Sequence, residues 1–182
     1  MAKHWQAVFI DRDGTIGGTG HFTSPEEFIL FQGVQASIES LKNAGLKVIA
    51  FTNQTRISSG EVTENEFRMQ FNRFGFDDAL ICPHQVSDGC NCRKPSPRLL
   101  YSAAERYGLD LTKCVVIGDR WTDLIAAHEA GAQKILVKTG SGEADLTKYH
   151  NNLFYGKWRE VSPDFVANHL NEAVGWILDC RS

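Results

Sequence analysis

The sequence predicts an α/β fold in which helices cover both faces of a parallel sheet. Short apolar runs alternate with amphipathic stretches along the chain, the pattern of strands joined by crossover helices. The 182 residues, 42% of them hydrophobic, are enough for one well-formed core. No internal repeat, low-complexity tract or linker divides the chain. We therefore expect a single domain over residues 1–182, built as a doubly wound, Rossmann-like sheet.

Five short runs, most of them rich in Val, Ile or Phe, are predicted to form the strands, at residues 6–10, 47–52, 79–82, 115–118 and 134–138. Amphipathic stretches between and after them predict helices, at residues 34–44, 64–74, 97–107, 121–130 and 166–179. Thr63 followed by Glu66 is a capping-box pattern at the start of the second helix. Gly45 follows the first helix and is expected to end it.

Two irregular stretches, residues 14–30 and 82–97, interrupt this alternation. The first is rich in glycine, and the second holds Cys, His and Pro without periodicity. Each directly follows a predicted strand. Ligands of doubly wound proteins bind outside the carboxyl ends of the strands. We therefore expect both stretches to border the functional crevice.

Composition narrows the classes of function. The net charge is −3 and Lys and Arg are scattered, which gives no support for a nucleic-acid partner. No apolar stretch approaches the roughly 20 residues that cross a bilayer, and residues 1–5 lack the apolar core of a signal peptide. We expect a cytoplasmic protein with no membrane partner. Without a long apolar edge or a heptad pattern, we expect a monomer.

Carboxylates follow two of the predicted strands. Asp11 ends the first apolar run and Asp13 comes two residues later, whereas Asp119 ends the fourth and Asp123 comes four residues later. If these strands are neighbours, the carboxylates meet at one edge of the sheet. Carboxylate oxygens are ligands that Mg²⁺ prefers, so the pattern predicts a magnesium site. Taken alone, Asp13-Gly14 would also fit a turn, and Asp123 would fit a first-turn acid that complements a helix dipole.

A hydroxyl and an ammonium are expected at the same edge. Thr52 ends the second predicted strand, and Lys94 lies in the second irregular stretch. Both are donors suited to a bound phosphate. The alternative for Thr52 is that it only caps its strand.

A cluster of soft and borderline ligands lies within residues 82–92. It reads C-x-H followed by C-x-C and consists of Cys82, His84, Cys90 and Cys92. This set suits tetrahedral Zn²⁺. We interpret it as a structural zinc site that pins the loop before Arg93 and Lys94; the alternative is a set of buried thiols. Five cysteines, three of them in one segment, suit a reducing compartment better than a disulfide framework.

Four segments in order resemble the motifs of the haloacid dehalogenase-like (HAD) phosphatases. They are Asp11-Arg12-Asp13-Gly14-Thr15, Thr52-Asn53-Gln54, Arg93-Lys94-Pro95 and Gly118-Asp119-Arg120-Trp121-Thr122-Asp123. The match covers roughly residues 6–140. The resemblance implies a HAD-like fold with a minimal cap and a Mg²⁺-dependent phosphatase that forms an aspartyl-phosphate.

The resemblance also implies a role for each acidic residue. Asp11 would be the nucleophile, and Asp13 the general acid and then the general base. Asp11, the backbone carbonyl of Asp13 and Asp119 would hold Mg²⁺. Asp123 would either orient a metal-bound water or support Lys94.

The basic and polar residues of the motifs would bind the substrate. Thr52 would donate to a phosphate oxygen, and Lys94 would offset the charge of the phosphoryl group and of Asp11. We expect further substrate contacts from five residues: Asn53, Arg93, Arg120, His21 and Arg56.

The cysteine loop resembles the HAD branch that contains D-glycero-D-manno-heptose 1,7-bisphosphate phosphatase and histidinol-phosphate phosphatase. Segments 52–54, 90–95 and 136–140 are more similar to the heptose-bisphosphate side. We therefore expect a small phosphorylated metabolite as substrate, with a sugar bisphosphate first and histidinol phosphate as the alternative. A non-catalytic phosphate-binding protein is the rival class, and the intact Asp11 and Asp13 argue against it. A phosphotransferase or mutase would use the same intermediate, but an open site admits water.

Overall fold

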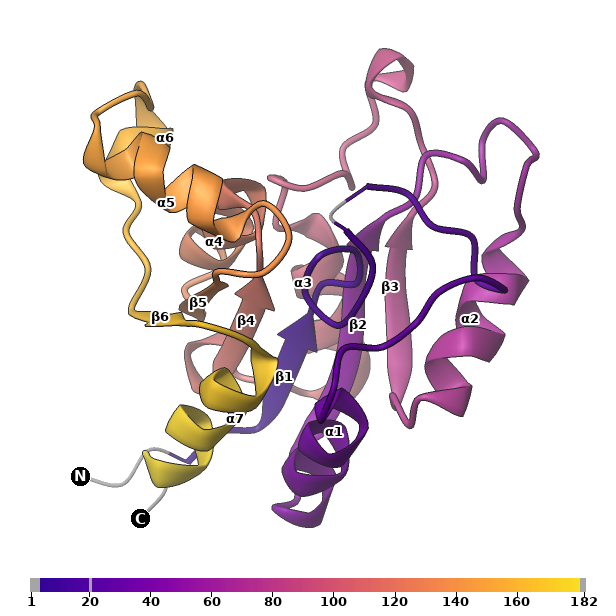
Figure 1. The fold of residues 1–182 in the computed structure, drawn as a ribbon, viewed down its shortest axis with the longest axis horizontal. Coiled ribbons are helices and arrows are strands. Elements are labelled where there is room, and N and C mark those ends of the chain that lie inside the picture. The colour runs from indigo at the N-terminus through magenta and orange to yellow at the C-terminus, as the bar shows by residue number, and fades with distance from the viewer. Residues whose placement is uncertain (1–3, 20, 181–182) are drawn as a thin grey trace.

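Six parallel strands form one continuous sheet in the order β3-β2-β1-β4-β5-β6 (Figure 1). The computed structural model of the chain describes residues 4–19 and 21–180, so the expectation on the N-terminus falls largely outside the described residues. The strands are β1 (Ala7–Ile10), β2 (Lys47–Asn53), β3 (Asp78–Cys82), β4 (Cys114–Gly118), β5 (Gln133–Val137) and β6 (Phe165–Ala167). The predicted doubly wound α/β architecture is confirmed, with all five predicted strands present.

The helices are α1 (Val34–Asn43), α2 (Glu64–Arg73), α3 (Arg98–Tyr107), α4 (Trp121–Glu129), α5 (Gly142–His150), α6 (Lys157–Glu160) and α7 (Leu170–Asp179), with 3-10 turns at Val86–Asp88 and Leu111–Lys113. The predicted capping box is present, because the Thr63 hydroxyl accepts from the Glu66 N–H and the Glu66 carboxylate accepts from the Thr63 N–H. Gly45 follows α1 at a φ of 78°, as expected for a glycine that ends a helix. None of the described helices is long and apolar enough to span a membrane.

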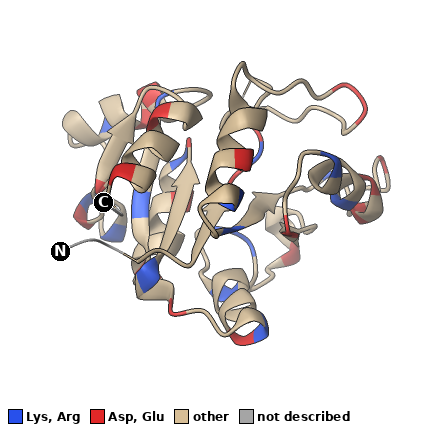
Figure 2. Ribbon diagram, turned by 90° about the horizontal axis from the view of Figure 1, so that it is seen from below, with Lys and Arg blue, Asp and Glu red and all other residues tan. Residues whose placement is uncertain are grey.

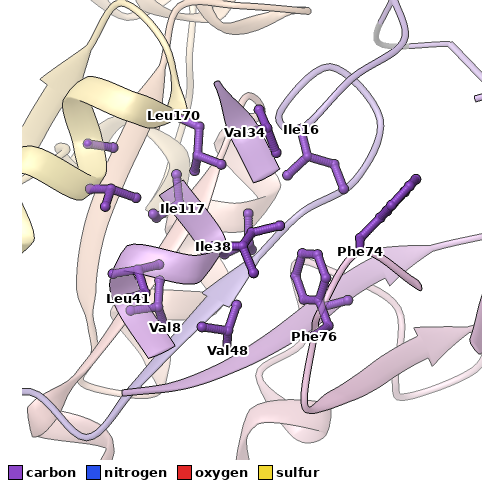
Figure 3. Close-up of a cluster of buried hydrophobic side chains, with 14 of the residues drawn as sticks. Val8, Ile16, Val34, Ile38, Leu41, Val48, Phe74, Phe76, Ile117 and Leu170 are labelled. Atoms are coloured by element: carbon purple, nitrogen blue, oxygen red, sulfur yellow. The ribbon is translucent and has the colours of Figure 1, made fainter. Parts of the chain in front are cut away.

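Alternate residues of each strand point to opposite faces of the sheet. On one face Val8, Val48 and Ile117 pack with α1, α2 and α7, as Figure 3 shows for Ile38 and Leu170. On the other face Phe9, Phe51 and Val116 pack with side chains of α3 and α4. The strands are buried on both sides, which is why they read as continuous apolar runs.

The C-terminal part differs from the prediction. Residues 166–179 were expected to form one helix, but Phe165–Ala167 pair with β5 as the sixth strand and α7 begins only at Leu170. His169, with an extended backbone, caps α7 by accepting from the Glu172 N–H. A strand of three apolar residues fits the helical apolar pattern equally well, so periodicity alone did not separate the two. Helices α5 and α6 were not predicted either, since no long apolar stripe marks them.

Acidic and basic residues are interspersed over the helices and loops (Figure 2). Many of them form pairs at the surface, such as Arg68 with Glu64 and Arg106 with Asp78. Exposed pairs of this kind contribute little to stability, roughly 0–1 kcal/mol each. Asp11, Asp119 and Asp123, by contrast, are buried next to the carboxyl ends of β1 and β4.

The strand order brings the motifs together. Strand β1 lies between β2 and β4, and all three run in the same direction. Their carboxyl ends therefore meet at one edge, next to the point where the strand order reverses. The loop after β1 has only isolated bridges at Gly17, to Asp13 and Leu30, among its described residues. No folded cap stands over the edge in the described part of that loop.

Candidate active site

Lys94 lies at the centre of the strand ends and binds both acidic motifs. Its Nζ donates to Asp11 Oδ1 at 2.9 Å, to Asp123 Oδ1 at 2.6 Å and to the carbonyl oxygen of Phe51 at 2.8 Å. All these groups are buried. Although burial opposes a charged ammonium, the Asp11 and Asp123 carboxylates raise the pKa of Lys94. The amine therefore stays protonated.

Three buried carboxylates face this single ammonium. Ligand oxygens of Asp11, Asp119 and Asp123 all lie within 4.8 Å of one another. Burial, together with the neighbouring Asp11 and Asp123 carboxylates, raises the pKa of Asp119 to about 8. Such an excess of buried negative charge is costly without a cation. The oxygen-only donor set fits the magnesium site that the sequence predicts.

Asp119 is held by the loops on both sides of it. Its Oδ2 accepts from the Ser141 N–H at 2.7 Å, just before α5, and its Oδ1 accepts from the Thr15 hydroxyl at 3.3 Å. Neither Thr15 nor Ser141 was among the residues expected from the sequence to be functional. Thr15 lies inside the first motif, which is the signal that would have found it, whereas Ser141 has no such marker.

Asp123 lies against the last residue of β4. Its Oδ1 accepts from Lys94, and its Oδ2 accepts from the Arg120 N–H at 3.1 Å. A Cβ at Gly118 would overlap the Asp123 carboxylate. The direct hydrogen bond to Lys94 Nζ suits the supporting role that was one of the two expected for Asp123.

Two side chains hold the Asp13 carboxyl. Arg12 Nη1 donates to Asp13 Oδ1 at 2.6 Å, and Gln54 Nε2 donates to Asp13 Oδ2 at 2.7 Å. Gln54 Nε2 also donates to the Thr52 hydroxyl at 2.9 Å. Burial raises the pKa of Asp13 above its ordinary value, although Arg12 opposes the shift. A raised pKa suits a carboxyl group that must both give and take a proton near neutral pH. Neither Arg12 nor Gln54 was named as functional from the sequence, although both lie within the motifs.

A cavity of about 260 Å³ opens above these groups. Asp11, Asp13, Thr52 and Lys94 line it, and so do four of the five residues expected to contact substrate: His21, Asn53, Arg93 and Arg120. Phe22, Gln54, Thr55 and Thr122 complete the wall.

Arg56, the fifth expected contact, is not part of this wall. Its Nη1 pairs with the Glu61 carboxylate at 2.8 Å, and its guanidinium lies 5.4 Å from the centre of the Phe22 ring. The structure thus brings Arg56 to the rim, beside a residue of the cavity wall. An exposed ion pair within its own loop holds it there.

Asn53 both lines the cavity and holds the loop that carries Lys94. Its Oδ1 accepts from the Lys94 N–H at 3.1 Å, and its Nδ2 donates to the Lys94 carbonyl at 3.4 Å. The end of β2 is thereby joined to the second irregular stretch.

The predicted cysteine and histidine cluster is assembled beside this loop. Cys82 Sγ lies 3.7 Å from Cys90 Sγ and 3.5 Å from Cys92 Sγ, and Cys92 Sγ lies 3.3 Å from His84 Nδ1. A tetrahedral zinc with bonds of about 2.3 Å to sulfur spaces its ligands by roughly 3.8 Å. The cluster therefore has the dimensions of a metal site, and the Arg93 guanidinium donates to the His84 carbonyl at 3.3 Å.

Comparison with known families agrees with the arrangement of the motifs. Residues 19–131 match the family model of the haloacid dehalogenase-like hydrolases. The chain belongs to this family. A second HAD-hydrolase-like model matches residues 91–173. The resemblance drawn from the four motifs is thus confirmed, and this HAD protein is a phosphoric monoester hydrolase.

Curated relatives share most of the chain. The D-glycero-beta-D-manno-heptose-1,7-bisphosphate 7-phosphatase of Vibrio cholerae is 34% identical in an alignment of 158 positions, gaps included, and the alignment covers 77% of this chain and 84% of the relative. The D-glycero-D-manno-heptose-1,7-bisphosphate 7-phosphatase of Chlorobaculum tepidum is 32% identical in an alignment of 197 positions, gaps included, which covers 95% of this chain and 94% of the relative.

A solved structure has the same fold. The crystal structure of D,D-heptose 1,7-bisphosphate phosphatase from B. bronchiseptica, complexed with magnesium and phosphate, has a TM-score of 0.79 and 29% sequence identity. The match covers 96% of this HAD chain and 98% of that one. The likeness therefore extends over nearly the whole chain and is not confined to the motifs.

Proposed function

We propose that this HAD phosphatase is Mg²⁺-dependent and removes one phosphoryl group from a sugar bisphosphate of the heptose 1,7-bisphosphate type. The observation that carries the proposal is the buried Asp11, paired with Lys94 and facing a cavity that Asp13 also lines. The substrate class rests on the relatives, whose names specify heptose 1,7-bisphosphate. The alternative, already indicated by the sequence, is a histidinol-phosphate phosphatase.

In the first step Asp11 acts as the nucleophile. A carboxylate oxygen of Asp11 attacks phosphorus, the ester P–O bond breaks, and Asp13 gives its proton to the leaving alkoxide. Lys94 orients Asp11 and offsets charge on the phosphoryl oxygens, and Thr52 donates a hydrogen bond to one of them. Mg²⁺ held by Asp11, Asp119 and the Asp13 carbonyl would supply further charge neutralisation.

In the second step Asp13 acts as the base. Its carboxylate takes a proton from water, the water oxygen attacks phosphorus, and the bond between phosphorus and Asp11 breaks. Inorganic phosphate leaves, Asp11 is regenerated and Asp13 is protonated again. The open cavity admits the water that this step consumes.

Basic residues of the cavity wall suit the second phosphate of the substrate. Arg93 and Arg120 both line the wall, and His21 adds a third nitrogen donor from the loop after β1. Two guanidinium groups in one cavity favour a dianion over a neutral leaving group. Asp123 serves, in this proposal, to hold Lys94 between itself and Asp11.

We propose Zn²⁺ as the metal of Cys82, His84, Cys90 and Cys92, in a structural role. The support is the spacing of the ligand atoms, which suits tetrahedral zinc. With Arg93 and Lys94 following Cys92 directly, a rigid metal site would fix two residues of the cavity wall. The cytoplasmic location and monomeric state remain predictions, and light scattering would check the second.

Release of inorganic phosphate from a panel of metabolites tests the proposal. The panel contains heptose 1,7-bisphosphate, its monophosphates, histidinol phosphate and unrelated sugar phosphates, each assayed with and without added Mg²⁺. We expect the highest kcat/KM for the bisphosphate and no turnover by Asp11→Asn. Activity that survives this substitution would overturn the nucleophile assignment, and a higher kcat/KM for histidinol phosphate would favour the alternative.

A further inference from the structure

Arg12 is fully buried between the two catalytic aspartates in the sequence, yet it is absent from the cavity wall. Its guanidinium lies 3.8 Å from the centre of the Phe28 ring and 5.0 Å from that of Phe67. Both rings are themselves buried. Burial of a charged arginine lowers the stability of the fold unless ion pairs and hydrogen bonds offset the loss of hydration.

The directed contacts of Arg12 lead to Asp13 and to α2. Nη1 donates to Asp13 Oδ1 at 2.6 Å, and Nε donates to Gln70 Oε1 at 2.8 Å. Nη2 makes no hydrogen bond within the described residues. Gln70 therefore orients the guanidinium on one side, and the guanidinium holds Asp13 Oδ1 on the other, while Gln54 holds Asp13 Oδ2.

Gln70 is in turn held on both sides. This residue of α2 is buried, and its Nε2 donates to the Pro25 carbonyl at 2.7 Å. One orientation of the amide satisfies both bonds, because the carbonyl oxygen faces Arg12 and the NH₂ faces Pro25. The contacts thus run from the loop after β1, through α2, to Asp13.

We propose that Arg12 and Gln70 are positioning residues for the reaction: they hold the Asp13 carboxyl where it transfers a proton to and from the reacting oxygens. The proposal rests on the acid and base role proposed above for Asp13. Neither side chain reaches the cavity, so their effect on the reaction passes through Asp13.

This role predicts a selective kinetic effect. Proton transfer requires heavy atoms about 2.6–3.2 Å apart, and a displacement of about 1 Å can lower the rate roughly 100-fold. An alkoxide leaving group needs the proton from Asp13, whereas p-nitrophenolate leaves without it. Loss of the Arg12–Gln70 hydrogen bond should therefore slow the hydrolysis of a sugar phosphate more than the first turnover of p-nitrophenyl phosphate.

The test compares Gln70→Met and Arg12→Met with the wild type on two substrates. One is the sugar phosphate that the wild type hydrolyses best, and the other is p-nitrophenyl phosphate. Methionine nearly matches glutamine in length and removes both hydrogen bonds. Arg73→Met is the matched control, because Arg73 is also on α2 with its guanidinium over a phenylalanine ring, but outside the cavity.

We expect kcat for the sugar phosphate to fall about 10- to 100-fold in both variants, with KM nearly unchanged. With p-nitrophenyl phosphate, rapid mixing should show a first turnover close to that of the wild type, followed by a slower steady state. That pattern reflects a retained attack by Asp11 and an impaired base. Arg73→Met should match the wild type throughout.

An equal loss on both substrates that includes the first turnover would show a merely structural role and overturn the proposal. So would unchanged kinetics. If Arg12→Met does not fold, Gln70→Met and Arg12→Lys decide the question. Each rate is divided by the fraction of enzyme that is folded at the assay temperature, which thermal melts give. Asp13→Asn distinguishes failure of the Asp13 role from failure of the positioning role. If Asp13→Asn slows the hydrolysis of both substrates equally, the acid and base role of Asp13 is wrong. If Asp13→Asn slows them differently and the Arg12 and Gln70 variants do not, only the positioning role is wrong.

Discussion

Gly14 and Gly140 meet backbone to backbone beside the Asp119 carboxylate. A Cβ on Gly14 would lie 2.9 Å from Gly140 Cα, and either residue would overlap Asp119 Oδ2 if it carried a side chain. Both have positive φ, at 83° and 55°. The loops after β1 and β5 therefore close around the candidate metal site only because both residues lack a Cβ.

Gly140→Ala should lower both stability and activity. The new methyl group would push against Gly14 and Asp119 from a backbone conformation that alanine disfavours. We expect a loss of about 3 kcal/mol or more in the free energy of unfolding, and weaker Mg²⁺ affinity. Chemical denaturation and Mg²⁺ titration of activity measure the two effects.

Gly45→Ala is the control that measures the cost of placing alanine in a left-handed backbone conformation without a steric clash. Gly45 has a φ of 78°, but nothing lies within 4 Å of the position of its Cβ. We expect only the cost of the left-handed conformation, about 1–2 kcal/mol, with unchanged kcat. Equal effects of the two substitutions would contradict the close approach at Gly140.

Lys94→Met should leave two buried carboxylates without their counter-charge. Removing one partner from a buried ion pair costs roughly 3–5 kcal/mol, so we expect a clear fall in Tm together with loss of turnover. Adding Asp123→Asn to this variant should restore part of the Tm and none of the activity. A double variant that melts no higher than Lys94→Met would argue against the pairing of Lys94 with Asp123.

The raised pKa of Asp119 predicts how stability depends on pH. With a pKa of about 8 in the folded protein and an ordinary value of 3.8, the folded state holds a proton that the unfolded chain has lost between these values. Stability without Mg²⁺ should therefore fall as pH rises through this window. Mg²⁺ needs the ionised carboxylate, so the increase in Tm on its addition should be larger at pH 8.5 than at pH 6.

Thermal melts of desalted protein, with and without Mg²⁺ across this range, measure the effect. Asp119→Asn should reduce the pH dependence most between pH 6 and pH 8, because burial raises the pKa of Asp123 only to about 6. A Mg²⁺-induced increase in Tm that is larger at pH 6 than at pH 8.5 would contradict the proposed protonation of Asp119.

Cys90→Ala should lower the zinc content well below the wild-type value, which we expect to be about one per chain. The loop before Arg93 and Lys94 would lose its anchor, so both Tm and kcat should fall while Asp11 stays intact. Metal analysis of protein purified without chelator gives the content. Cys180→Ala, outside the cluster, should keep its zinc; wild-type protein without zinc would refute the site.

The alternation of apolar runs was enough to predict the sheet, because a strand buried on both faces is marked by its own residues. β4 and β5 were found within one residue of their observed bounds. β6 was not, because its three residues obtain their strand conformation from pairing with β5. Local pattern carries no information on such pairing.

The candidate site divides in the same way. Asp11, Thr52 and Asp119 were predictable together because each ends a strand, and parallel strands end at the same edge. Asn53 and Arg56, both expected to contact substrate, differ in the structure: Asn53 lines the cavity and holds the Lys94 backbone, while Arg56 pairs with Glu61 at the rim. Their surroundings, and not their residue types, decided this.

The sequence alone was enough to identify this chain as a HAD phosphatase, since the four motifs are short segments whose order and spacing can be read directly. The tertiary structure decided how those groups are held. Arg12 and Gln70 are 58 residues apart in the chain and 2.8 Å apart in space, and Gly14 touches Gly140 from a different loop. Such contacts arise only when the whole sheet and its helices pack, because each partner is positioned by a different element.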